Sequence, residues 1–279
     1  MSAARPTRVR PAAVAGAFYP AEPGELRAAV ERSFGGAHPG EPGVPAPKAL
    51  VVPHAGYPYS GPVAASAYLR LAAGRGTIRR VVLIGPSHRV AFRGVAVSSA
   101  DVFRTPLGDI PVDDESRRLA LATPAAVLDD QPHALEHSLE VQLPFLQTVL
   151  DGGGSDSDGP DGFSVLPLVT GACRDDEVAE VLDAVWGGPE TVVVVSTDLS
   201  HYHRYADAVE LDRRTAGAIV AGQVDGIDDR DACGASGLRG LLVAAGERQM
   251  PAELLDLRNS GDTAGDRERV VGYGAFAFT

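Results

Sequence analysis

Three uninterrupted aliphatic runs constrain the fold of this chain more than any other feature. They are Leu50–Val52, Val81–Ile84 and Val192–Val195, and none alternates between apolar and polar residues. A strand with one solvent-facing side alternates, whereas a strand covered on both faces reads as a continuous apolar run. The runs therefore predict a sheet that is buried between two layers of helices.

Helix-like segments lie between and around these runs. Apolar residues at helical spacing predict helices over residues 25–34, 63–71, 139–149, 176–185 and 205–221. Pro144 should confine or kink the third of them. Further strands are predicted at residues 95–98, at 163–169 and in the C-terminal "RVVGYGAFAFT", whose alternation is typical of an edge or returning strand. The order predicts a three-layer α/β/α sandwich with a largely parallel or mixed central sheet.

Two stretches interrupt this order without dividing it into domains. Residues 38–48 are rich in proline and glycine, which predicts a surface connection, and residues 151–162 are acidic, which predicts a mobile loop. Hydrophobic strands resume on both sides of each stretch. We therefore expect one domain over residues 1–279, with residues 1–12 flexible.

The composition excludes several classes of protein. The formal net charge is −12, and no long basic block occurs beyond the first ten residues, which argues against nucleic acid or an anionic membrane as partner. Two cysteines, Cys173 and Cys233, cannot form a disulfide framework and suit a reducing compartment. No apolar signal core or membrane-spanning run is present. We expect a soluble, cytoplasmic protein.

Each aliphatic run ends at a small or turn-forming residue and then reaches a histidine. These histidines are His54, His88 and His201, from only seven in the chain, and Asp198 follows the third run as well. Ligands of open α/β sheets bind beyond the carboxyl ends of the strands. If the strands are neighbours, the side chains converge on a metal or acid–base site. A lone histidine in such a loop is more often structural, so spacing alone leaves both interpretations open.

Two other stretches carry candidate residues. In "EHSLE", a helix start would place Glu136 and Glu140 on one face, with His137 about 100° around the helix. A functional role and a solvated, charged helix start are equally compatible with this pattern. In "ACGASG", Cys233 precedes the apolar helix predicted around Leu238–Val243.

The two cysteines invite different interpretations. A thiol at a helix N-terminus tends toward a lowered pKa and can bind soft metals or react with oxidants, which would suit Cys233. The alternative is a small buried thiol, and Cys173 fits that better. Ser87, Ser196 and Ser200 flank the histidines, but no G-x-S-x-G elbow or phosphate-binding loop occurs, so serine hydrolysis is a minor alternative.

Six motifs in order resemble those of the Memo family. They are "PHAGYPYSG", "GPSH", "FRTPLGD", "EHSLEVQLPFL", "VSTDLSHY" and the later "CG", and "AGAFYP" resembles the N-terminal motif of the family. The resemblance extends from about Val14 to the C-terminus. It implies a fold related to the class III extradiol dioxygenases, which are non-haem iron enzymes that open catechol rings.

The resemblance also implies a site. His54, His88 and Cys233 are its metal-ligand candidates, and His201 is the expected acid–base group, with Asp198 setting its charge and orientation. His137 and Glu136 fall in another motif close to the same pocket, and we include both among the catalytic candidates. Tyr57 and Tyr59 would either line the pocket or serve as packing aromatics.

One difference from the ring-cleaving enzymes affects the expected cofactor. Those enzymes hold Fe(II) with two histidines and a carboxylate, whereas the third position here matches Cys233. Thiolate is softer and more easily oxidised, which favours copper, zinc or a redox-reactive iron site. We expect iron or copper, with zinc as a further option.

The expected function is a metal-dependent, dioxygenase-like oxidoreductase acting on a small molecule or peptide. The alternatives are a non-catalytic metal- or peptide-binding protein that keeps the pocket, and a metal-dependent hydrolase. The chain also resembles the B component of the bacterial AmmeMemoRadiSam grouping. That resemblance implies a radical-SAM protein and the A component of the grouping as partners.

Overall fold

A mixed sheet forms the centre of the computed structural model, which describes residues 6–38, 43–150 and 162–279. The acidic stretch 151–161 and residues 39–42 of the predicted connection lie outside the described residues. The sheet has the strand order β10-β12-β2-β9-β3-β8-β4-β7, and β11 pairs with β12. The strands are β2 (Ala49–Val52), β3 (Arg80–Pro86), β4 (Val95–Val97), β7 (Ala126–Leu128), β8 (Ser164–Thr170), β9 (Thr191–Ser196), β10 (His201–His203), β11 (Ala252–Asn259) and β12 (Val270–Phe278).

The four central strands run parallel to one another, and the strand on either side of them runs antiparallel to its central neighbour. β2, β9, β3 and β8 are parallel neighbours, whereas β4 is antiparallel to β8 and β12 is antiparallel to β2. β12 also pairs with β10 and β11, so it is a returning strand inside the sheet rather than an edge. The predicted largely parallel or mixed sheet is confirmed.

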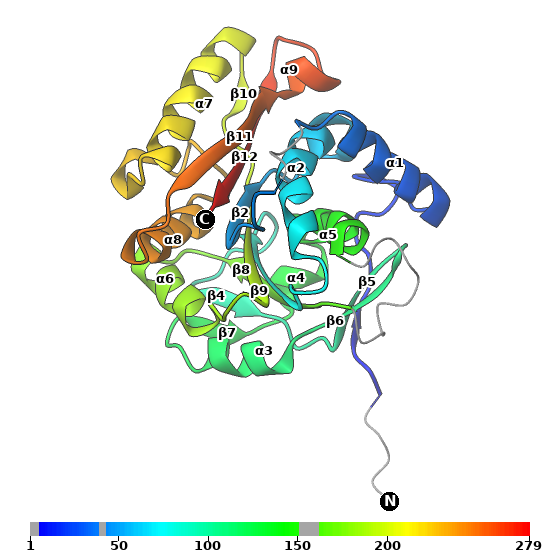
Figure 1. Cartoon of the computed structure of the whole chain (residues 1–279). Helices are drawn as coiled ribbons and strands as arrows, with labels where there is room; N and C mark the ends of the chain where they lie inside the picture. The colour runs from blue at the N-terminus through cyan, green and yellow to red at the C-terminus, as the bar shows by residue number, and fades with distance from the viewer. Residues whose placement is uncertain (1–5, 39–42, 151–161) are drawn as a thin grey trace, which may run out of the picture.

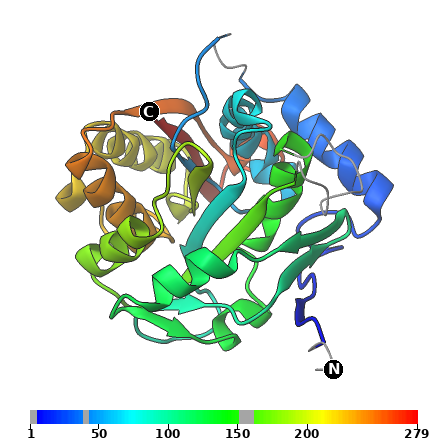
Figure 2. The same cartoon turned by 60° about the horizontal axis from the view of Figure 1, so that its bottom comes forward.

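Helices cover both faces of this sheet (Figures 1 and 2). One layer contains α1 (Pro23–Gly35), α2 (Tyr57–Leu71) and α5 (Leu143–Leu150). The other contains α3 (Asp114–Leu121), α6 (Asp175–Ala184), α7 (Tyr205–Val220) and α8 (Ala235–Glu247). The predicted three-layer α/β/α architecture is therefore correct. Two short helices, α4 (Gln131–Ala134) and α9 (Ser260–Thr263), lie in connections.

The aliphatic runs supply both hydrophobic cores. In β2, Leu50 and Val52 pack into the core beneath α1, α2 and α5, while Ala49 and Val51 pack into the core on the other face. β3 and β9 divide their side chains between the two faces in the same way. Because each of these strands buries both of its faces, its central residues are all apolar.

A second, smaller sheet lies beside the main one. β1 (Val9–Arg10) is parallel to β5 (Val102–Thr105), which pairs with β6 (Gly108–Pro111). The dark blue N-terminal segment runs beside β5 in both views (Figures 1 and 2). Residues 9–10, which lie in the segment expected to be flexible, thus belong to a strand.

Pro144 confines its helix, as predicted. It is the second residue of α5, where a proline costs no helical hydrogen bond, and the 3₁₀ helix η2 (Glu140–Gln142) precedes it. The regular helix thus begins four residues later than the predicted start at residue 139. Among the described residues, no helix is both long enough and apolar enough to cross a membrane.

Gly94 occupies a backbone position that other residues cannot adopt easily. Its φ is 90°, and a Cβ atom there would lie 2.4 Å from the carbonyl oxygen of Ala125. We expect Gly94→Ala to lower the free energy of unfolding by at least about 2 kcal/mol, from backbone strain and the clash together. Urea denaturation measures this change.

The control for this substitution is Gly246→Ala. Gly246 lies in α8, and a Cβ atom there would meet nothing within 4 Å. Because alanine is the better helix former, we expect this variant to gain about 0.5–1 kcal/mol. Equal destabilisation of both variants would show that the carbonyl of Ala125 does not restrict position 94.

Candidate functional site

The three aliphatic strands deliver candidate side chains to one edge of the sheet. β2 ends two residues before His54, β3 ends two residues before His88, and β9 ends two residues before Asp198. β9 lies between β2 and β3, and all three strands are parallel. Their carboxyl ends therefore meet at the same edge, so the side chains that follow them can share a site.

These side chains line a cavity of about 780 Å³. Its walls include nearly all of the candidate site residues, namely His54, His88, His137, Asp198, His201 and Cys233. Glu136 lies behind this wall, hydrogen-bonded to the rings of two of the histidines. Phe18, Tyr202 and Arg230 also line the cavity.

Three imidazoles in the cavity are close enough to share one ion. His54, His88 and His137 each offer a ring nitrogen, and these nitrogens all lie within 4.8 Å of one another. We call these three residues the histidine cluster. His137 lies in the turn between α4 and η2 and does not follow a strand. Its place beside the other two histidines could therefore not be predicted from the ends of the strands. Only the "EHSLE" motif marked His137.

Glu136 hydrogen-bonds to two rings of the histidine cluster. Its carboxylate lies 2.9 Å from Nδ1 of His88 and 3.0 Å from Nδ1 of His137. It also accepts from the backbone amides of His88, His137 and Ser138. Burial raises the pKa of Glu136, but the hydrogen bonds from His137 and His88 outweigh burial and hold it well below the usual value.

This carboxylate determines which nitrogens remain free. An ionised carboxylate only accepts, so Nδ1 of His88 and Nδ1 of His137 must each carry a proton. The only ring nitrogen of each that can offer a lone pair to a metal is then Nε2. A carboxylate that hydrogen-bonds the far nitrogen of a histidine is the usual support of metal-binding imidazoles.

His54 has the same tautomer for a different reason. Ser196 donates its hydroxyl proton to the carbonyl of Ser138 at 2.6 Å, so its oxygen must accept from Nδ1 of His54 at 2.9 Å. Nε2 of His54 is therefore free of a proton. Burial, with the charges of His137 and His88 next, lowers the pKa of His54 well below its usual value, so the ring stays neutral at neutral pH.

The serines beside the histidines are not activated nucleophiles. Ser196 gives its proton to a carbonyl, and Ser87 donates to the carbonyl of Val90 at 2.7 Å. Ser200 is buried, and its hydroxyl has no partner among the described residues. His54 is within hydrogen-bond distance of Ser196, but its Nδ1 already donates to the serine and cannot take the hydroxyl proton.

Cys233 lies beside the histidine cluster but does not have a lowered pKa. Its sulfur is 3.2 Å from Nε2 of His54, and it accepts from the amide of Asp198 at 3.3 Å. Burial raises the pKa of Cys233 to about 12, and the charge of Asp198 acts in the same direction. Of the two interpretations of this thiol, burial therefore favours the small buried thiol over a lowered pKa.

His201 is oriented by a backbone carbonyl. Its Nδ1 lies 2.8 Å from the carbonyl oxygen of Leu199, which can only accept, so Nδ1 carries a proton. Asp198, which we expected to orient this ring, instead accepts from the backbone amide of His54 at 2.7 Å. Burial raises the pKa of Asp198. Asp198 therefore holds the loop of His54, and Leu199 holds His201.

The predicted helix start at "EHSLE" is wrong. Glu136 and His137 lie in a non-helical turn, and η2 begins only at Glu140. The turn forms because the Glu136 carboxylate accepts from the amides of the two residues that follow it. Glu140 consequently shares no helix face with Glu136. It is fully buried and paired with Arg10.

The remaining candidate residues have structural partners. Tyr57 is buried and donates to the carbonyl of Val141 at 2.8 Å, so it packs rather than faces the cavity. Tyr59 is 42% exposed and is absent from the residues that line the cavity. Cys173 is partly buried and donates to the carbonyl of Gly171, and burial raises its pKa to about 11.

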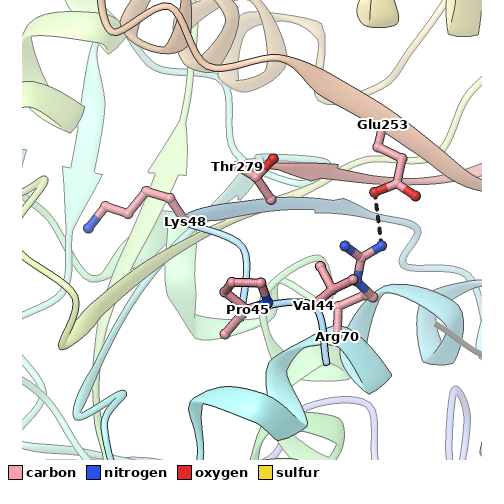
Figure 3. A pocket seen from close by; sticks show the side chains of 7 residues that line it. Val44, Pro45, Lys48, Arg70, Glu253 and Thr279 are labelled. Carbon is pink, nitrogen blue, oxygen red and sulfur yellow. Dashed lines mark hydrogen bonds and ion pairs between the residues drawn. The ribbon is translucent and has the colours of Figure 1, made fainter. Parts of the chain in front are cut away.

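A second cavity, of about 460 Å³, lies at the other end of β2 (Figure 3). Residues 44–46 and Lys48, just ahead of β2, line it with Arg70, Glu253 and Thr279. Arg70 donates to Glu253, and the Lys48 ammonium points away, toward the carbonyls of Trp186 and Thr191. Its charged side chains are thus already paired, and it contains no imidazole or thiol.

His133 predicts a pH dependence of stability. The ring is 2% exposed, Nε2 donates to the carbonyl of Ala96, and Nδ1 has no partner among the described residues. Burial lowers its pKa to about 4, against about 6.5 in an unfolded chain. Between these values the unfolded chain binds more protons. Stability from this group is therefore complete above pH 6.5 and falls toward pH 4, by up to about 1.4 kcal/mol per pH unit.

The measurement is urea denaturation of wild type and His133→Gln between pH 4 and pH 7. Glutamine keeps a donor for Ala96 and does not titrate, so the difference between the two proteins should shrink with falling pH. Asp212 titrates in the same window with the opposite sign, because burial raises its pKa to about 6, but it is common to both proteins. A constant difference would contradict the assignment.

Comparisons with known proteins identify relatives over nearly the whole length. A family described as "Memo-like protein" matches residues 10–277. A "MEMO1 family protein" of Desulfurococcus amylolyticus is 35% identical over 284 residues, which cover 95% of this chain and 97% of that protein. A "MEMO1 family protein" of Ignicoccus hospitalis is 38% identical, with 97% and 98% of the two chains covered.

A solved structure shares the fold. It is that of an uncharacterized protein from Escherichia coli K12, which aligns with a TM-score of 0.51 over 81% of this chain and 98% of that chain. The two sequences are 14% identical. This likeness concerns the path of the chain alone.

Proposed function

The chain belongs to the Memo family, and from that premise we propose that its histidine cluster binds a transition-metal ion and that the protein is a metal-dependent oxidoreductase. His54, His88 and His137 would be the ligands on the cluster side. Cys233, which the family resemblance implies as a ligand, would be a further donor because its sulfur lies against Nε2 of His54. The substrate would be a small molecule or peptide that enters the cavity of about 780 Å³.

One observation carries the proposal: Nδ1 of each ring in the cluster lies against a hydrogen-bond acceptor, Glu136 or Ser196, which leaves Nε2 as the nitrogen that can bind a metal. Three convergent imidazole lone pairs suit iron, copper or zinc. Burial keeps His54 neutral, which a metal ligand requires. A thiol beside the cluster is a soft donor and favours copper or a redox-reactive iron site. The residues present therefore fit the metal that the family resemblance implies.

Bound iron or copper would supply redox and Lewis-acid chemistry to a substrate in the cavity. The chain's own residues would then handle protons and orientation. His201 would accept a proton at Nε2, because its Nδ1 proton is held by the carbonyl of Leu199. Asp198 holds the backbone of His54, and Glu136 holds the rings of His88 and His137. The Phe18 ring covers the ring of His137, with the two ring centroids 4.5 Å apart, and would exclude water from that side of the cluster.

A metal-dependent hydrolase is the second candidate function. Three histidines are also a common ligand set of catalytic zinc, with one position left for water. The radical-SAM protein and the A component of the AmmeMemoRadiSam grouping remain proposed partners on the strength of the family resemblance. A non-catalytic binding protein with this pocket is the third candidate.

The test is to express the protein anaerobically, purify it without a metal-binding tag and measure bound metals by mass spectrometry. The protein reconstituted with iron, copper or zinc is then screened for oxygen uptake and, under anaerobic conditions, for hydrolysis. Stoichiometric iron or copper with oxygen uptake supports the oxidoreductase. Zinc with anaerobic hydrolysis supports the hydrolase instead. Failure to bind any of the three metals would overturn the proposal.

A further inference from the structure

We propose that Arg10 is a positioning residue for the histidine cluster, acting through the turn that carries Glu136 and His137. The inference rests on the proposed metal site and assigns it a support that is remote in sequence. Arg10 itself lines no part of the cavity and touches none of the three imidazoles. It is placed by β1, which pairs with β5 in the smaller sheet.

Arg10 holds the turn at both ends. Its guanidinium is 6% exposed, Nε donates to the carbonyl of His133 at 3.0 Å, and Nη2 donates to the carbonyl of Glu136 at 2.6 Å. Nη1 is hydrogen-bonded to the carboxylate of Glu140. The planar fork of one arginine thus fixes three points of residues 133–140, which a lysine with its single ammonium could not do.

Glu140 ties the same guanidinium to the N-terminal segment. This carboxylate is fully buried and accepts from the amides of Ala13 and Val14, at 2.7 and 3.0 Å, and from the hydroxyl of Tyr19 at 2.5 Å. Four donors therefore satisfy it, and one of them is the charged guanidinium of Arg10. The Arg10–Glu140 pair thus joins residues 10–19 to the turn that carries Glu136 and His137.

Glu136 connects this unit to the cluster. Its carbonyl accepts from Arg10, while its carboxylate hydrogen-bonds to the rings of His88 and His137. The N-terminal segment also reaches the cluster directly, since Phe18 packs on the ring of His137 at 4.5 Å. A shift of the Glu136 backbone would therefore move both rings at once.

Loss of the guanidinium should loosen the turn while leaving the strands in place. His54 and His88 follow β2 and β3, but His137 depends on the turn for its position. Without Arg10, two carbonyls of the turn lose their donor and Glu140 keeps a buried charge without a cation. The three imidazole rings would no longer be held together, so metal affinity should fall while the sheet remains intact.

The test measures the affinity of the full-length protein for Co²⁺ by competition with a chromophoric chelator. We expect Arg10→Gln to weaken binding by about 10- to 100-fold, the range for residues that orient metal ligands, and Arg10→Lys to weaken it less. The visible spectrum of bound Co²⁺ should change in Arg10→Gln, because it reports the arrangement of the ligands. The matched control is Arg8→Gln: Arg8 pairs with Asp101 and not with the turn, so affinity should stay within about twofold.

Two further measurements separate positioning from general destabilisation. Gly94→Ala lowers stability without touching the turn and should bind Co²⁺ as wild type does while folded. If Arg10→Gln does not fold, Arg10→Lys and Glu140→Gln provide the same comparison. Wild-type affinity and an unchanged Co²⁺ spectrum in all of the folded variants would overturn the inference.

If wild-type protein binds no metal, the proposed function fails, but the positioning role is still testable. Hydrogen exchange of a peptide covering residues 133–142 should then be faster in Arg10→Gln than in Arg8→Gln, because the amides of His137 and Ser138 depend on the position of the Glu136 carboxylate. Equal exchange in the two variants would contradict it.

Discussion

His137→Ala protein purified anaerobically should contain no stoichiometric metal, and His54→Ala and His88→Ala should behave in the same way. Each ring provides one of three convergent nitrogens that lie within 4.8 Å of one another. A structural metal site is worth on the order of 10–16 kcal/mol, so one ligand contributes about 3–4 kcal/mol, or roughly 100- to 1,000-fold in affinity. Mass spectrometry of the purified variants measures the loss.

Cys233→Ser decides whether His137 or Cys233 is the third main ligand beside His54 and His88. If the histidine cluster is the main binding unit, this variant should keep its metal with reduced affinity. Complete loss in Cys233→Ser, with metal retained in His137→Ala, would instead establish His54, His88 and Cys233, as the resemblance implies. His38→Ala is the control, because His38 is exposed, lies outside the cavity and should not alter metal content.

Glu136→Gln should weaken metal binding by about 100-fold or more. The wild-type carboxylate hydrogen-bonds with both His88 and His137 while also accepting from three amides. A glutamine has one accepting oxygen, and its amide group donates, so at least one ring must lose its partner or change tautomer. Each such orienting contact is worth about 10- to 100-fold in affinity.

Chelator competition measures this loss, and nitrogen NMR of the histidine rings shows the tautomers directly. In wild type, both rings should carry the proton on Nδ1, and in Glu136→Gln at least one should not. Glu177→Gln serves as the control, because Glu177 caps α6 at the protein surface. Unchanged affinity in Glu136→Gln would mean that other contacts orient the two rings.

The sequence predicted the parts of the site that depend on local chain direction. His54 and His88 each follow a buried strand by two residues, so knowing that the strands are parallel is enough to bring them to one edge. The motif "EHSLE" marked Glu136 and His137, but the helix assigned to it was wrong. Local periodicity does not show that the Glu136 side chain accepts from the backbone of its own turn.

The pKa of Cys233 also could not be predicted from local sequence. The position of Cys233 near the start of α8 was compatible with a lowered pKa, yet burial raises it to about 12, with Asp198 adding to the shift. Position relative to a helix can be inferred from the sequence, whereas desolvation depends on every neighbour in space. The partners of Asp198 and His201 could not be assigned for the same reason.

The sequence by itself determined the α/β class, the mixed sheet and the two strand-end histidines, because aliphatic runs and chain direction are local properties. Only the tertiary structure decided that His137 joins them, that Glu136 and Ser196 accept from Nδ1 of the three rings, and that Arg10 meets Glu140. Arg10 and Glu140 are 130 residues apart in the chain. Hydrogen bonds and burial between such distant groups arise only when the layers pack, so no local pattern encodes them.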